Sequence, residues 1–280
     1  MAAGQGATVS NLLQASVNLL PHGLRRHIWR IPGIAAFQRW LIGHFASGAS
    51  FIHTVHGGPA SSLRFELILP QDKAIWAGTF EHEFARVLQS AVQPGDVCYD
   101  IGGYRGYMAG VMALVGAAEV AVFEPLTANH AALEKFCALN PALPIHLHHI
   151  AVGDRDGTAT FKTMPDRSMG KLSTSAFQLS VAAAGEQQVS IRRLDSLVAE
   201  AQIPPPHVLK IDVEGAEDQV LAGAQAVLQK YRPRIYLEAH STALEVLCRA
   251  NLGRLGYTTT VLETPPFQDE QPRHLICIPR

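Results

Sequence analysis

The chain has 280 residues, and its 23 Lys and Arg against 24 Asp and Glu give a formal charge of −1 at pH 7. Hydrophobic residues make up 48% of the chain and charged residues only 17%, which excludes a disordered protein. The balanced charge argues against a nucleic-acid partner, because binding to a phosphate backbone needs clustered Lys and Arg.

The cysteines and the charge pattern bear on cellular location. None of the four cysteines has the C-x-x-C spacing of zinc or redox motifs, and free thiols are typical of a reducing cytosol. Residues 1–10 contain no Lys or Arg, unlike a secretory signal. The longest stretch without charged residues, 40–63, contains His and Gly and fails as a membrane span. We predict a cytoplasmic protein with no integral membrane span.

The first 48 residues are predicted to form short helices in a locally basic stretch. We expect a packing or oligomerisation surface, which would allow a homodimer; the alternative is contact with a membrane surface or a polyanionic substrate. Two apolar runs, 51–56 and 63–69, flank a Gly-Gly-Pro turn and predict a β-hairpin. Residues 1–73 are therefore predicted to be an appendage, and residues 74–280 the main domain.

Beyond Asp96, short apolar strands alternate with helical stretches, which predicts a parallel sheet covered on both faces. The predicted strands are 97–101, 120–123, 145–152, 208–212, 234–239, 258–263 and 274–279. The last two have too short a link for a crossover, so we expect them to be antiparallel. The predicted fold class is α/β, with a Rossmann-like, seven-stranded, mostly parallel sheet containing one antiparallel strand. An inserted hairpin is expected within about residues 157–194, with its loop tip at about 164–185.

A glycine-rich turn follows the first of these strands, in the sequence Asp100-Ile-Gly102-Gly103-Tyr104-Arg105-Gly106. Glycines let the backbone turn tightly beside a ligand, and the helix that follows directs its N-terminal amides to the same place. Glu124 ends the next strand, where a carboxylate can accept hydrogen bonds from ribose hydroxyls. This spacing indicates a site for a ribose-bearing ligand. The alternative is a turn that only packs strand against helix.

Both NAD and S-adenosylmethionine (SAM) carry a ribose that fits such a site. NAD loops usually read G-x-G-x-x-G, whereas position 104 here is Tyr and the pattern from Asp100 is D-x-G-x-x-x-G. The second pattern is that of a SAM loop, whose acidic residue can engage the amino end of the methionine moiety. SAM is therefore the predicted cofactor, and an NAD-dependent enzyme is the weaker alternative.

Charged residues also end the fourth and fifth predicted strands. Lys210 and Asp212 alternate onto one side of the fourth strand, with Glu214 close by at the turn. Glu238 and His240 share a face of the fifth strand. Charges at the end of an apolar strand are costly unless they meet one another, a ligand or solvent. We expect these side chains to lie together; the alternative for Asp212 or Glu214 is to cap the following helix.

Six motifs then occur in order along the chain. They are the D-x-G-x-x-x-G loop from Asp100, Phe123-Glu124-Pro125, Ala151-Val152-Gly153-Asp154, Arg193-Leu194-Asp195-Ser196-Leu197, Lys210-Ile-Asp212-Val-Glu214-Gly215-Ala216-Glu217 and Glu238-Ala-His240. Over roughly residues 74–242 the chain thus resembles the FkbM family of SAM-dependent methyltransferases, which have the class I methyltransferase fold. The resemblance implies methyl transfer to a hydroxyl of a small molecule, namely a sugar, a polyketide or another secondary-metabolite scaffold. The family usually has Asn where Tyr104 stands, which leaves a catalytically impaired SAM-binding partner protein as one alternative. An N-methyltransferase of the same fold is a separate alternative.

The motifs and the resemblance together name the candidate site residues. Those expected to bind SAM are Asp100, Gly102, Gly103, Tyr104, Gly106, Glu124, Pro125, Ala151, Val152, Asp212 and Glu214. We expect His240 to be the general base, with Glu238 or Asp212 as its helper. Lys210 would orient the carboxylates or stabilise negative charge on the reacting oxygen. A metal is not favoured, although a divalent ion held by Asp212, Glu238 and His240 is an alternative way to activate an alcohol.

Overall fold

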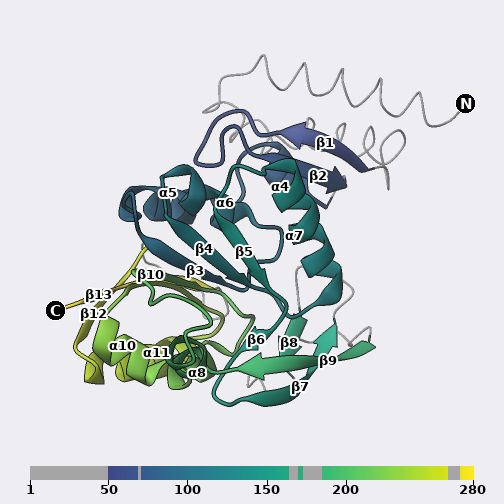
Figure 1. Ribbon diagram of the computed structural model, residues 1–280. Coiled ribbons are helices and arrows are strands. Elements are labelled where there is room, and N and C mark those ends of the chain that lie inside the picture. Colours follow the sequence, from purple (N-terminus) through teal and green to yellow (C-terminus); the bar gives the residue numbers. More distant parts are fainter. Residues whose placement is uncertain (1–49, 69–70, 164–169, 173–184, 264–271) are drawn as a thin grey trace, which may run out of the picture. The chain divides into compact units, whose positions relative to one another are not determined.

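The computed structural model describes residues 50–68, 71–163, 170–172, 185–263 and 272–280 (Figure 1). The helices predicted within residues 1–48 and most of the loop tip predicted at 164–185 lie outside these residues. Contacts divide the described chain into two units. The first contains residues 50–89 and 135–141, and the second contains residues 90–134 and 142–280. The division predicted at residue 73 stays a prediction.

The first unit contains the predicted hairpin. Its strands, β1 (Ser50–Thr54) and β2 (Arg64–Ile68), are antiparallel. Alternation along β2 buries Phe65 and Leu67, and the ring of Phe65 stacks on Phe136 with 4.7 Å between ring centroids. The short helix α4 (Lys73–Trp76) follows, and then α5 (His82–Ala91), which continues into the second unit.

The second unit is built on a seven-stranded sheet in the order β12-β13-β11-β10-β3-β4-β5 (Figure 1). The strands are β3 (Val97–Ile101), β4 (Glu119–Phe123), β5 (Ile145–His148), β10 (Val208–Ile211), β11 (Arg234–Ala239), β12 (Tyr257–Val261) and β13 (Arg273–Pro279). Within this sheet β13 is the one reversed strand. It pairs antiparallel with both β11 and β12, and the other strand pairs are parallel. The predicted fold class, including the antiparallel final pair, is confirmed.

Helices cover both faces of this sheet. They are α6 (Tyr107–Leu114), α7 (Thr127–Leu139), α8 (Leu194–Ala199), α9 (Glu217–Ala222), α10 (Gln225–Tyr231) and α11 (Thr242–Arg254). Apolar side chains of α8, α9, α10 and α11 share one buried cluster with one face of the sheet. Helix α6 contacts β3, β4 and β5. No helix in the described part of the chain is both long and apolar enough to cross a membrane.

The strand predicted over 145–152 is wrong as a single element. The chain leaves the large sheet after β5, and β6 (Ala151–Val152) instead pairs in parallel with β9 (Gly185–Arg192). Strand β9 also pairs antiparallel with β7 (Gly157–Thr163), which in turn pairs with β8 (Gly170–Leu172). This second sheet contains the predicted inserted hairpin, and pairing with its strand β9 accounts for the break.

Candidate functional site

The turn after β3 presses directly against the end of β10. Gly102 has a φ of +85°, and a Cβ on it would lie 1.7 Å from the carbonyl oxygen of Asp212. A Cβ on Gly103 would lie 2.1 Å from the Val122 side chain. Only glycine fits these two positions. The close approach of Gly102 to Asp212 brings the predicted SAM loop against the charged end of β10.

Glu124 holds the same turn in place from the end of β4. It is 5% exposed, and its two carboxylate oxygens accept hydrogen bonds from the backbone N–H groups of Tyr104 (3.0 Å) and Leu126 (2.9 Å). Burial raises the pKa of Glu124 above its ordinary value. The Asn129 side chain donates a third hydrogen bond to this carboxylate, which leaves one of its roughly four lone-pair positions for a ribose hydroxyl. Tyr104 has a φ of 43°, a left-handed conformation that is strained for a residue with a side chain.

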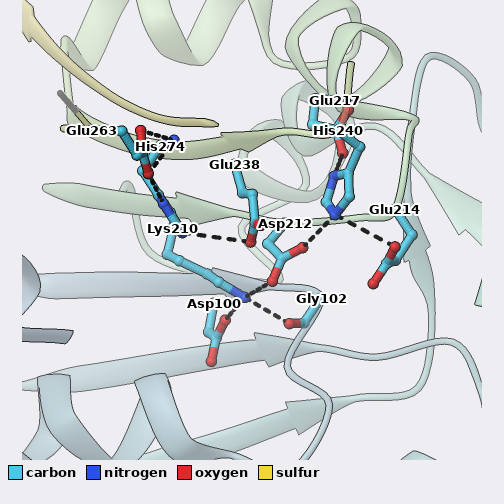
Figure 2. Close-up of polar contacts among 10 residues, drawn as sticks. All are labelled: Asp100, Gly102, Lys210, Asp212, Glu214, Glu217, Glu238, His240, Glu263 and His274. Atoms are coloured by element: carbon cyan, nitrogen blue, oxygen red, sulfur yellow. Dashed lines mark hydrogen bonds and ion pairs between the residues drawn. The ribbon is translucent and has the colours of Figure 1, made fainter. Parts of the chain in front are cut away.

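Lys210 is a buried cation that joins the ends of β3 and β10 (Figure 2). Its Nζ lies 3.1 Å from Asp100 Oδ1 and 3.3 Å from Asp212 Oδ2, and it donates a 2.8 Å hydrogen bond to the Gly102 carbonyl. Burial raises the pKa of Asp100. Burial also opposes ionisation of Asp212, but the charges of Lys210 and His240 outweigh it and lower the pKa of Asp212.

His240 directly follows β11, and carboxylates surround its buried ring (Figure 2). Its Nδ1 lies 2.9 Å from Glu217 Oε1. Its Nε2 lies 3.4 Å from Glu214 Oε2 and 3.6 Å from Asp212 Oδ1. Burial lowers the pKa of His240, but the hydrogen bond to Glu217 and the nearby negative charges reverse the shift and raise the pKa to about 10. The ring is therefore an imidazolium at neutral pH in this arrangement.

Glu214 stands out among these carboxylates. It has a φ of 54°, again a left-handed conformation in a residue with a side chain. Burial raises its pKa to about 7. Helix α9 begins just beyond it, and the N-cap of that helix, Ala216, has no side-chain capping hydrogen bond. Instead, Glu217 accepts a 2.9 Å hydrogen bond from the Gly215 N–H, so Glu214 faces His240 rather than the helix end.

Glu238 is positioned by two residues that the sequence analysis missed. His274 lies opposite Glu238 in the antiparallel pairing of β11 with β13, and its Nε2 is 3.6 Å from Glu238 Oε2. The other ring nitrogen of His274 lies 2.5 Å from Glu263 Oε1. The Glu238↔His274 register is the signal that could have found His274. Glu217, also missed as a site residue, already stood in the motif that begins at Lys210.

The structure brings most of the predicted site residues together. Asp100, Gly102, Lys210, Asp212, Glu214, Glu238 and His240 meet at the carboxyl ends of β3, β10 and β11, as Figure 2 shows. Gly103, Tyr104 and Glu124 lie in or against the adjoining turn, and Gly106 begins α6 with a φ of +80°.

The remaining predicted SAM contacts lie along the second sheet. The carbonyl of Pro125 accepts a hydrogen bond from Gln187 Nε2 (3.2 Å), which links it to β9. Ala151 and Val152 form β6, and their side chains are buried in apolar clusters. The structure places none of these three in the charged cluster around His240, and their part in SAM binding stays a prediction.

The chain and its fold are similar to several known proteins. The chain is 28% identical over 151 residues to the hexuronic acid methyltransferase AglP of Haloferax volcanii, which covers 53% of this chain and 58% of that protein. It thus spans little more than half the length of this curated relative. Among solved structures, the methyltransferase FkbM of Methylobacillus flagellatus KT has 16% sequence identity and a TM-score of 0.45, covering 73% of this chain and 54% of that one.

A further solved structure is the precorrin-6y C5,15-methyltransferase of Geobacter metallireducens GS-15. It has 13% identity and a TM-score of 0.45, and covers 70% of this chain and 87% of that one. The family comparison is more specific, because the Methyltransferase FkbM domain matches residues 100–257, which run from the end of β3 to the first residue of β12. The chain belongs to the FkbM family of SAM-dependent methyltransferases.

Proposed function

We propose that this protein transfers the methyl group of SAM to a hydroxyl oxygen of a sugar or another small-molecule scaffold. The observation that carries the proposal is the close approach of the Gly102 turn to Asp212, which sets a SAM-type loop beside a cluster of acid–base groups. A sugar acceptor is favoured because the curated relative AglP is a hexuronic acid methyltransferase.

The residues at the carboxyl ends of β3 and β4 fit SAM by their chemistry. The glycines of the turn from Gly102 to Gly106 carry no side chains that would keep a ligand from the backbone, and the Glu124 carboxylate keeps acceptor capacity suited to a ribose hydroxyl. Asp100 is completely buried and paired with Lys210, so it supports the turn from the protein interior. SAM supplies an activated methyl group, and the protein aligns the acceptor and removes its proton.

The cluster around His240 is the proposed proton acceptor. The acceptor oxygen attacks the methyl carbon; the O–CH₃ bond forms, the S–CH₃ bond breaks and S-adenosylhomocysteine leaves. The hydroxyl proton passes to the pair formed by His240 and Glu214, whose facing atoms are 3.4 Å apart. Because its carboxylate neighbours keep His240 protonated, the ring accepts a proton only after giving its own to a neighbour, and Glu214 is the nearest to its Nε2. A positioned base of this kind contributes about 10²–10⁴-fold in rate.

Calorimetry and turnover together test this proposal. We expect SAM to bind to the purified chain, and Glu124→Gln to weaken that binding. We expect transfer of labelled methyl from SAM to uronic-acid sugars or other polyhydroxyl acceptors, with the product giving an O–CH₃ signal by NMR. An N–CH₃ product would show that the acceptor group is an amine and not a hydroxyl. SAM binding without transfer to any acceptor would instead support a binding partner that lacks catalysis.

A further inference from the structure

The side chains around His240 have the composition of a cation site. We propose that Asp212, Glu238 and His240 bind one divalent cation, Mg²⁺ or Mn²⁺. One ligand atom from each residue lies within 4.8 Å of the other two. Figure 2 shows the three side chains converging from the ends of β10 and β11.

The spacing of these atoms is close to that of an occupied site. With metal–oxygen distances of about 2.1 Å, adjacent ligands of an octahedral ion are about 3 Å apart and opposite ligands about 4.2 Å apart. The observed separations of up to 4.8 Å therefore need contraction by only a few tenths of an ångström to about 2 Å. The Nε2 atom of His240 already lies 3.6 Å from Asp212 Oδ1. Side-chain rotation alone can provide such a movement, because all three residues lie at strand ends.

Each of the three ligands is oriented by a polar or charged neighbour behind it. Glu217, which is completely buried, binds the Nδ1 atom of His240 and leaves Nε2 directed into the cluster. Metal-binding histidines nearly always have such a partner on the other ring nitrogen, often a carboxylate. Lys210 pairs with Oδ2 of Asp212, while Oδ1 faces His240. His274 plays the same part for Glu238.

The charges of the cluster also call for a further cation. Four carboxylates, those of Asp212, Glu214, Glu217 and Glu238, surround the one imidazole of His240. Their exposed side-chain fractions are 23% or less. Buried carboxylates repel one another unless cations compensate them; the imidazolium of His240 compensates one charge, and Lys210 compensates Asp212 only in part because Asp100 shares it. A divalent ion brings two positive charges to the place that the side chains of Asp212, Glu238 and His240 share.

A cation at this position has a defined use, and this role rests on the proposed function. An ion held by three protein ligands keeps coordination positions open, which suits an acceptor with neighbouring hydroxyl or carboxylate oxygens. Binding to the ion would make the acceptor hydroxyl more acidic, and its proton would pass to Glu214 while the O–CH₃ bond forms. With the ion bound, His240 would hold it, and Glu214 would be the member of the His240–Glu214 pair that takes the proton.

Direct metal binding tests the site without reference to catalysis. The full chain is stripped with EDTA, and Mn²⁺ binding is followed by calorimetry and by the loss of the free Mn²⁺ signal in electron paramagnetic resonance. We expect one site, competed by Mg²⁺, and at least a 10-fold loss of affinity in Glu238→Gln and in His240→Gln. Glu217→Gln should lower the affinity about 10- to 100-fold, because it releases the ring of His240. The control is His146→Gln, which removes an exposed imidazole from β5.

The outcomes separate the cation site from the proposed function. Absence of Mn²⁺ and Mg²⁺ binding to wild-type protein would overturn the cation site, as would equal affinities in the Glu238 and His146 variants. Circular dichroism confirms that each variant is folded, and Asp212→Asn replaces any variant that is not. Methyl transfer that continues fully in EDTA would overturn the cation's role but leave the methyltransferase proposal standing. Metal binding without methyl transfer to any acceptor would leave the cation site standing and overturn the methyltransferase proposal.

Discussion

Replacement of Lys210 by methionine tests the electrostatic centre of the site. The substitution keeps most of the length of the unbranched side chain and removes its charge. It leaves Asp100, which is fully buried, without its ion pair, and it removes the donor to the Gly102 carbonyl. Breaking a buried pair by removing one partner costs about 3–5 kcal/mol. We therefore expect the free energy of unfolding of Lys210→Met to fall by that amount at pH 7.

Urea unfolding followed by circular dichroism measures this loss. The matched control is Lys135→Met, because Lys135 pairs with Glu66 at 3.6 Å while their side chains are 49% and 37% exposed. An exposed pair contributes about 0–1 kcal/mol. Adding Asp100→Asn to Lys210→Met removes the unpaired charge and should recover part of the stability. A loss no larger in Lys210→Met than in Lys135→Met would refute the assignment of Lys210 as the counter-ion of Asp100.

Acid should reduce the penalty in the same variant. Burial already raises the pKa of Asp100 in the wild-type protein, and removal of Lys210 takes away a positive charge that opposes this rise. A carboxyl whose folded-state pKa lies above its unfolded-state pKa destabilises the fold at high pH, and protonation relieves this as the pH falls. The difference between wild type and Lys210→Met should therefore shrink from pH 7 to pH 5. A difference that stays constant with pH would contradict this account.

Three further changes test other parts of the fold and site. Gly102→Ala places a Cβ against the Asp212 carbonyl oxygen, so we expect a lower melting temperature, a stability loss above about 2 kcal/mol and weaker SAM binding by calorimetry. Hydrogen bonds from Ser196 and the Arg193 backbone, with Arg192, lower the pKa of Asp156 to about 2. This stabilisation is present above the ordinary pKa of 3.8 and is lost as the pH falls towards 2. Because the Asp156 side chain is 44% exposed and solvent screens its interactions, we expect Asp156→Asn to cost no more than about 1 kcal/mol at pH 5 and little at pH 2 in urea titrations. His240→Gln should lower turnover about 10²–10⁴-fold while SAM affinity stays the same, and unchanged initial rates would exclude His240 from catalysis.

The large sheet could be predicted because its signals are local. Short apolar strands, helical stretches and the short link before the last strand each follow from the spacing of neighbouring residues. The break after β5 could not be predicted in this way. Only two residues separate Ala151 and Val152 from β5, and the chain leaves the large sheet there because β9 supplies a competing partner from forty residues away along the chain. Such a choice depends on tertiary pairing and leaves no signal in the local pattern.

The charged site shows the same division between local and distant causes. Lys210, Asp212 and Glu214 stand within one motif, so alternation along a strand was enough to place them together. His274 and Glu263 come from the last two strands, and they approach Glu238 only through the antiparallel register of β11 with β13. The direction of the final strand pair was predicted from the sequence, but its register was not. A prediction of register would have been needed to find them.

Backbone strain in the two turns is explained by their mutual contact. Tyr104 and Glu214 both have positive φ values although both carry side chains, and such residues cost of order 1–3 kcal/mol each. Each follows a strand whose end lies at the contact between Gly102 and Asp212. The strain at Tyr104 accompanies the hydrogen bond from its N–H to Glu124, and the strain at Glu214 accompanies the approach of its carboxylate to His240. Both contacts serve the proposed site more directly than they serve the core. The free energy lost to strain in these turns is offset by packing in the apolar cluster on one face of the sheet.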